Sequence, residues 1–202
     1  CCFSGSRYCC ATAPATEPIT TAEAKSHLRV DSSTDDTYIE TLITASRQYA
    51  ENYLGRALIT QTWDLTLDEW PINSPDGFYD SIIVPLAPLI SVTHVKYYDT
   101  SGVLQTVASS AYSVDINSTP GRISPVYGTV WESARFIPNA ITARFVAGYG
   151  AAADVPEGIK QAMKMLISQF YEYREEVVVG TIVARLDKAS EFLLRHHRID
   201  RA

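Results

Sequence analysis

The stretch DDTYIETLITASRQYAENYLG, residues 35–55, decides the fold, because it has the pattern of a long amphipathic helix that ends at a glycine. Its apolar and small residues recur with a period of about 3.6, so they share one helical face. That face consists of Ile39, Leu42, Ile43, Ser46, Ala50, Tyr53 and Leu54. Gly55 suits the left-handed conformation that commonly follows the last helical turn. The helix therefore needs a second apolar surface to pack against.

A second stretch with the same pattern, residues 156–176, supplies that surface. Pro156 suits the first turn of a helix, and the apolar face that follows consists of Ile159, Ala162, Met163, Leu166, Ile167, Phe170 and Tyr171. A shorter helix begins near Ile19, and Glu23 follows Thr20 by three residues, as in a capping box. We expect the helices of residues 19–55 and 156–176 to pack as a small bundle.

Residues 57–150, between the two long helices, indicate short β-strands and turns. Trp63, Leu65 and Leu67 alternate with polar residues, which is typical of a half-buried strand. Turn residues at 99–102 and 117–121 predict two hairpins, and residues 141–146 predict a further strand. The sequence thus predicts an α+β fold. A small helical platform carries a large antiparallel β insertion between its second and third helices, and a helical tail, residues 184–202, follows at the C-terminus.

The N-terminal residues 1–18 are rich in Ser, Thr, Ala and Pro, and we expect them to be disordered. The four cysteines of the chain, Cys1, Cys2, Cys9 and Cys10, all lie in this segment. Adjacent cysteines do not have the spacing of paired zinc ligands, so no metal site is expected. We interpret them as incidental to the fold, and a disulfide between the two pairs is the alternative in an oxidising compartment.

Bulk properties and motifs favour a structural protein over a catalyst. The net charge of −6 argues against extensive binding of nucleic acid, and no apolar run is long enough for a membrane span. The sequence contains no His-x-x-x-His pair, no Gly-x-Ser-x-Gly elbow and no phosphate-binding glycine loop. No residue is therefore nominated for catalysis, for a metal or for a cofactor.

Residues 177–183 form an apolar segment rich in β-branched side chains, namely Val177, Val178, Val179, Ile182 and Val183. An exposed strand of this composition tends to pair with another chain. Two interpretations stay open at this point. The segment is a strand inside the fold, or it is an arm that contacts a neighbouring subunit. A last short helix, residues 186–195, is followed by basic residues that suit its C-terminal end.

Several segments resemble, in order and spacing, the head–tail connector (adaptor) family of tailed phages. They are ITTAEAKSHLRVD at 19–31, YLGRALITQTW at 53–63, PVYGTVW at 125–131, RFVAGYG at 144–150, Pro156 with IKQA at 159–162, and YEYRE with VVVG at 171–180. The resemblance covers residues 19–194 and leaves the cysteine-bearing tail unexplained. It implies a connector domain at residues 19–183.

The resemblance also implies function and partners. Adaptors of this family are virion proteins of the neck, between capsid and tail, and are assembled in the host cytoplasm. They form a dodecameric ring on the portal protein and extend a channel through which double-stranded DNA passes without specific binding. A stopper or tail-terminator protein docks on the tail side, and no membrane is involved.

Site residues follow from the same resemblance, because the C-terminal segment of the family contacts the portal. Carried over, the portal contacts are Leu186, Phe192, Leu193, Leu194, Arg195, His196, His197 and Arg198. The natural candidates for contacts between subunits are the β insertion and residues 177–183. We therefore expect a chain that ends at Thr181 to fold but not to join the portal.

Three other functions are considered. A tail-side stopper or completion protein shares the context but is often shorter and more purely β. A bacterial surface lipoprotein is suggested by Cys1 and the aromatic β region. An enzyme of unrecognised type has no residue set to support it.

Overall fold

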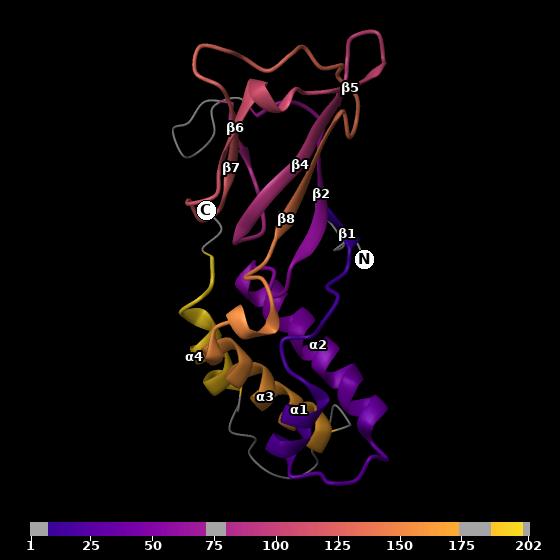
Figure 1. Cartoon of the computed structure of the whole chain (residues 1–202), viewed down its shortest axis with the longest axis vertical. Helices are drawn as coiled ribbons and strands as arrows, with labels where there is room; N and C mark the ends of the chain where they lie inside the picture. The colour runs from indigo at the N-terminus through magenta and orange to yellow at the C-terminus, as the bar shows by residue number, and fades with distance from the viewer. Residues whose placement is uncertain (1–7, 72–79, 174–186, 200–202) are drawn as a thin grey trace. The chain divides into compact units, whose positions relative to one another are not determined.

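The computed structural model describes residues 8–71, 80–173 and 187–199. The chain divides into two compact units, drawn in Figure 1. The β unit comprises residues 1–14 and 60–148, and the helical unit comprises residues 15–59 and 149–202. The α+β fold class predicted from the sequence is confirmed, and the β unit occupies nearly the residues predicted as the β insertion.

The helical unit contains α1 (Thr21–Leu28), α2 (Asp36–Leu54), the short 3-10 helix η2 (Ala152–Asp154), α3 (Glu157–Glu172) and α4 (Asp187–Arg195). The predicted capping box is present, since the Thr20 hydroxyl accepts from Glu23 N and the Glu23 carboxylate accepts from Thr20 N. Gly55 follows α2 with a φ of 66° and donates its N–H to Glu51 O, as a left-handed C-cap does.

The core of the helical unit forms where the predicted apolar faces of α2 and α3 meet. Its buried members from these two helices are Ile39, Leu42, Ile43, Ala50, Leu54, Ile159, Ala162, Met163 and Ile167. Polar contacts at the rim hold the same two helices together. Tyr171 Oη donates to a carboxylate oxygen of Asp35 at 2.6 Å, and Tyr38 Oη donates to Phe170 O at 3.3 Å. The helical packing predicted from periodicity is confirmed.

A buried ion network on α2 is a feature that periodicity did not predict. Arg47 and Glu51 are only 7% and 8% exposed, although both have ionisable side chains. Arg47 donates from Nε to Glu17 at 2.7 Å and from Nη1 to Glu51 at 2.8 Å, and Glu51 also accepts from Leu58 N at 2.9 Å. The segments before α1 and after α2 therefore cover this side of α2, and charge pairing compensates for the desolvation.

The described residues of the β unit form two antiparallel sheets. The five-stranded sheet has the order β1-β2-β8-β4-β5, built from β1 (Tyr8–Thr12), β2 (Gln61–Leu67), β8 (Ile141–Ala147), β4 (Leu89–Tyr98) and β5 (Leu104–Thr106). The three-stranded sheet has the order β3-β7-β6, built from β3 (Ile82–Ile83), β7 (Arg122–Pro125) and β6 (Tyr112–Asp115). A 3-10 helix, η1 (Ser109–Ala111), precedes β6. Both predicted hairpins are confirmed, as the β4–β5 and β6–β7 pairs.

Alternation of burial along β2 and β8 separates the two faces of the five-stranded sheet. Trp63 pairs with Phe145 and Leu65 pairs with Ala143, and all four are buried. The intervening pair, Asp64 and Arg144, lies on the opposite face because successive side chains of a strand point to opposite sides. The Arg144 guanidinium donates two hydrogen bonds of 2.7 Å to the Asp64 carboxylate.

The prediction of disorder for residues 1–18 is wrong for Tyr8–Thr12, which form β1 at the edge of the five-stranded sheet. Amino-acid composition alone does not show that the edge of β2 offers backbone groups for pairing. The Tyr8 ring also packs edge-on against Trp63, with ring centroids 5.7 Å apart. Cys9 is disulfide-bonded, in line with the alternative interpretation of the N-terminal cysteines rather than with an incidental role.

Candidate functional site

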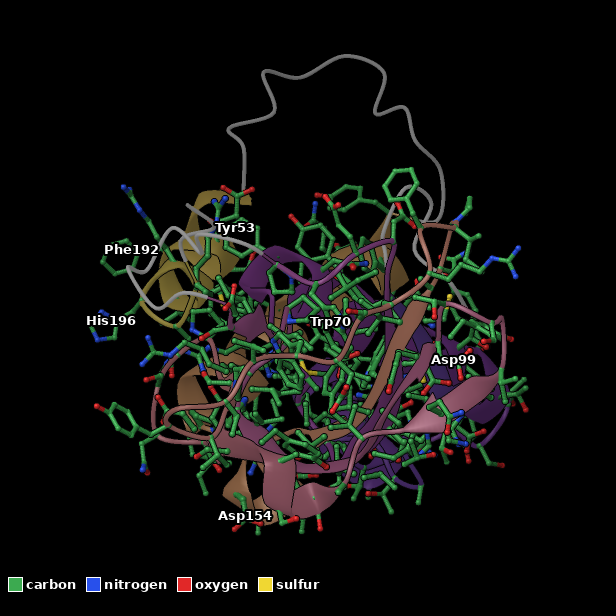
Figure 2. All side chains as sticks on the ribbon, turned by 90° about the horizontal axis from the view of Figure 1, so that it is seen from above. Tyr53, Trp70, Asp99, Asp154, Phe192 and His196 are labelled. Atoms are coloured by element: carbon green, nitrogen blue, oxygen red, sulfur yellow. The ribbon has the colours of Figure 1, made fainter. Side chains whose placement is uncertain are left out.

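The C-terminal helix α4 packs one side against the helical unit and leaves the other side free. Leu194 is completely buried in the core of the helical unit, Ser190 is 3% exposed, and Leu193 is partly buried against the same core. Phe192 is 78% exposed, and Arg195 and His196 are also exposed. Figure 2 shows Phe192 and His196 pointing away from the ribbon of α4. The helix therefore displays an aromatic ring beside basic groups.

The residues after α4 are held by the end of α2. Arg56 donates from Nε to His197 O at 2.6 Å, and Ile199 N donates to Leu54 O at 2.9 Å. The second bond satisfies one of the carbonyl groups that have no partner inside a helix at its C-terminal end. The Arg198 guanidinium lies 5.3 Å from the centre of the Tyr53 ring, a cation–π contact. Four residues beyond α4 are thus fixed to the helical unit.

The surface formed by Phe192, Arg195, His196 and Arg198 is named the C-terminal surface. His197 lies beneath it and is half-buried. Burial lowers the pKa of His197, and repulsion by His196 and Arg56 lowers it further. This shift favours the neutral form of His197, and Arg195 and Arg198 supply positive charge to the surface. An exposed aromatic ring beside arginines is the composition typical of a protein-binding hot spot.

Some of the predicted portal contacts are exposed in the structure, and others are partly or fully buried. Phe192, Arg195, His196 and Arg198 lie on the C-terminal surface, while Leu193 and His197 are partly covered. The prediction of Leu194 as a surface contact is wrong, because the amphipathic helix uses that residue as its own core contact. Leu186 lies outside the described residues, as do Val177, Val178, Val179, Ile182 and Val183. The proposed subunit contacts of residues 177–183 thus stay a prediction.

The position of Leu194 also changes what truncation is expected to do. A chain that ends at Thr181 lacks a side chain that fills the core of the helical unit. We now expect such a chain to lose stability as well as any partner contact.

Tyr53 and Arg56, which hold the C-terminal segment, were not predicted from the sequence. Tyr53 was placed on the buried face of α2, and it is only partly buried. Arg56 carries no signal of its own, although a basic residue directly after a helix end is suited to contact carbonyl groups.

The residues described contain no group of three or more metal-ligating side chains. No helix in that part of the chain is long and apolar enough to cross a membrane. One open hollow lies over α1 and α3, lined by Ala22, Glu23, Ser26, His27, Gln161 and Lys164, and another lies over α2.

The family model for phage gp6-like head–tail connector proteins matches residues 18–119, half of the chain. The chain belongs to this family. The matched region runs from α1 to the β6–β7 hairpin, and it includes Tyr53 and Arg56 but not α4. No curated protein matches the chain.

Solved structures extend the likeness over nearly the whole length of this connector-family chain. A chain from the neck of an empty gene transfer agent (GTA) particle, computed with C6 symmetry, matches with a TM-score of 0.75 and 23% identity. A chain from the virion of a native GTA particle matches with a TM-score of 0.75 and 22% identity. A chain from the neck of a native GTA particle, computed with C12 symmetry, matches with a TM-score of 0.69 and 21% identity. Each match covers 96% of both chains, and these identities establish a shared fold.

Proposed function

We propose that this protein is the head–tail adaptor of a tailed phage or a related particle. Twelve copies form a ring on the portal protein in the neck, between capsid and tail, after assembly in the host cytoplasm. The ring extends the DNA channel and docks the stopper or tail-terminator protein on its tail side. Its role is structural, and the chain performs no catalysis.

The observation that carries this proposal is the shared fold with chains of a particle neck, one of them computed with C12 symmetry, over 96% of the length. Membership of the connector family supports the same role. The net charge of −6 is compatible with a lumen that lets DNA slide, because tight phosphate binding requires clustered cations.

The C-terminal surface is the portal contact in this proposal. Phe192 provides an apolar contact, and Arg195, His196 and Arg198 provide polar ones, with Leu193 and His197 at the border. Leu186 precedes α4 and belongs to the same contact. The fixed position of residues 196–199 supports this assignment, because a preordered segment loses less entropy on binding.

Contacts between neighbouring subunits are assigned to Val177, Val178, Val179, Ile182 and Val183. A ring requires heterologous interfaces, in which one face of a subunit meets a different face of the next. The apolar, β-branched sequence of residues 177–183 suits such an interface.

The experiment is native mass spectrometry of the purified chain mixed with the portal protein of the same genome. A complex with twelve copies of the chain on the portal is expected. Phe192→Asp is expected to lower occupancy of the portal at least about tenfold, as loss of a central aromatic contact does. Ile116→Asp is the matched control, because Ile116 is 50% exposed in the β6–β7 hairpin, and it is expected to bind like the wild type. A wild-type chain that ignores the portal contradicts the proposal.

A further inference from the structure

The loop between β7 and β8 is long, and two stacked tryptophans fix it to the β unit. β7 ends at Pro125 and β8 begins at Ile141. The rings of Trp131 in the loop and Trp70 after β2 are parallel within 4°, with centroids 4.5 Å apart. Trp70 Nε1 donates to Glu132 O at 2.7 Å, and Trp131 Nε1 donates to Asp80 O. Loops of this length without their own helix or strand are commonly functional.

The same loop is also tied to the turn of the β4–β5 hairpin. Arg135 N donates to Tyr98 O at 2.8 Å, and Ala134 forms an isolated β-bridge with Asp99. The Arg135 guanidinium lies so close to Gly102 that a Cβ there would be 2.5 Å from Nη1. In Figure 1 the loop crosses the end of the β unit at which β5 and β6 are labelled. The loop therefore has a defined conformation rather than a loose one.

This ordered loop displays large apolar side chains to solvent. Tyr127 is 102% exposed, Phe136 is 85% exposed, and Val130 is 78% exposed. Single exposed apolar residues are ordinary, but three on one loop with two aromatic rings among them are characteristic of an interaction site. These residues add nothing to the core of the β unit, so folding does not account for them.

Acidic residues lie in the loop and on the elements that hold it. Glu132 is in the loop, Asp80 and Asp99 lie at its backbone contacts, and Asp68 accepts a hydrogen bond from Asn139 N at 2.8 Å. Glu69 is adjacent to Trp70, and Arg135 is a cation of the same loop. The apolar side chains are therefore set in an acidic border, which favours a basic partner.

The position of the loop in the chain indicates which kind of partner reaches it. The chain enters the β unit at Thr60, just before β2, and leaves it at Gly148, just after β8. The loop lies between the far ends of these strands, at the end of the β unit opposite both connections. Copies related by ring symmetry carry the same acidic loop, so a direct contact between two such loops would bring like charges together and is disfavoured.

We infer that residues 126–138 are the docking surface for the tail-side neck protein, through an apolar socket on that partner bordered by Lys and Arg side chains. This inference rests on the proposed function and assigns it a surface that is separate from the C-terminal surface. Tyr127, Val130 and Phe136 enter the socket, and Glu132 contacts its basic border.

Binding measurements with two purified partners test the inference. The full chain is immobilised, and the portal protein and the tail-side neck protein of the same genome are passed over it in separate runs. The double variant Val130→Ser/Phe136→Ser is expected to weaken binding of the tail-side protein at least about tenfold and to leave portal binding unchanged. Glu132→Lys is expected to weaken the same binding and to reduce its salt dependence. Ile116→Ser is the control and is expected to change neither.

The outcomes separate this inference from the proposed function. Unchanged binding of the tail-side protein by the double variant overturns the inference and leaves the adaptor role intact. Loss of portal binding or of ring formation instead shows that the portal or a second copy occupies the loop, and it also overturns the inference. A wild-type chain that binds the tail-side protein through the loop but ignores the portal supports the inference and refutes the portal contact. A wild-type chain that binds neither protein refutes both.

Discussion

The guanidinium of Arg56, two residues beyond the end of α2, donates a 2.6 Å hydrogen bond to the backbone carbonyl oxygen of His197, two residues beyond the end of α4. The same region contains the bond from Ile199 N to Leu54 O and the contact of Arg198 with Tyr53. These contacts hold the C-terminal segment against residues 53–56, at the end of α2. The proposed portal surface is thereby preformed in the free protein.

Arg56→Ala is expected to release residues 196–199 and to reduce the free energy of unfolding by about 1–2 kcal/mol, as loss of a charge-assisted hydrogen bond does. Hydrogen exchange at the Ile199 amide measures the release, because that amide is bonded to Leu54 O. Arg56→Lys keeps the charge and is expected to restore part of the protection. Unchanged exchange at Ile199 in Arg56→Ala contradicts the prediction.

Neighbouring residues of α4 are expected to respond in opposite ways. Leu194→Ala removes a fully buried side chain and is expected to cost about 2–5 kcal/mol of stability. Phe192→Ser removes a side chain that is 78% exposed and is expected to change stability by no more than about 0.5 kcal/mol. Urea unfolding of both variants measures the difference. Equal destabilisation by the two substitutions is inconsistent with the orientation of α4 described above.

Arg47→Met is expected to destabilise the helical unit by about 3 kcal/mol or more, because it leaves Glu51 buried without its cation. Urea unfolding measures the loss. The matched control is Lys160→Met, since Lys160 is buried but pairs with Glu157, whose side chain is 82% exposed. The control is expected to cost no more than about 1 kcal/mol.

A further variant distinguishes loss of charge pairing from loss of side-chain packing as the cause of this destabilisation. Adding Glu51→Gln to Arg47→Met removes the unpaired charge and is expected to recover part of the stability. No recovery in the double variant indicates that packing of the Arg47 stem, rather than charge pairing, is responsible.

The pH dependence of stability is expected to include a contribution from the Asp64–Arg144 pair. Hydrogen bonding from Arg144 lowers the pKa of Asp64 in the folded chain. The contribution is therefore complete above the unfolded pKa of about 4 and is lost as pH falls through the lower folded value. Thermal unfolding of Asp64→Asn is expected to show a lower Tm than wild type at pH 7, with a gap that narrows below about pH 4.

The control for this experiment is Asp31→Asn, at an exposed position between α1 and α2. It is expected to follow the wild-type pH profile. A gap for Asp64→Asn that stays constant between pH 7 and pH 3 argues against the ion pair as its cause.

The sequence by itself determined the helices and most strands, because each carries a local periodic signal. Ile39 to Leu54 and Ile159 to Ile167 recur at helical spacing, so their burial follows from the side of the helix on which they lie. Thr20, Glu23 and Gly55 marked helix ends through hydrogen bonds between residues close in sequence. Trp63 and Leu65 marked the inner face of β2 in the same way.

Only the tertiary structure decided features that depend on residues far apart in the chain. β1 pairs with β2 across about fifty residues, and composition predicted disorder there. The burial of Arg47 depends on its ion pair with Glu17, and the position of the C-terminal segment depends on its hydrogen bond with Arg56. Trp70 stacks on Trp131, which lies 61 positions later in the same loop as the exposed Phe136. Local periodicity contains no information on such pairings, because they form only when separate elements pack together.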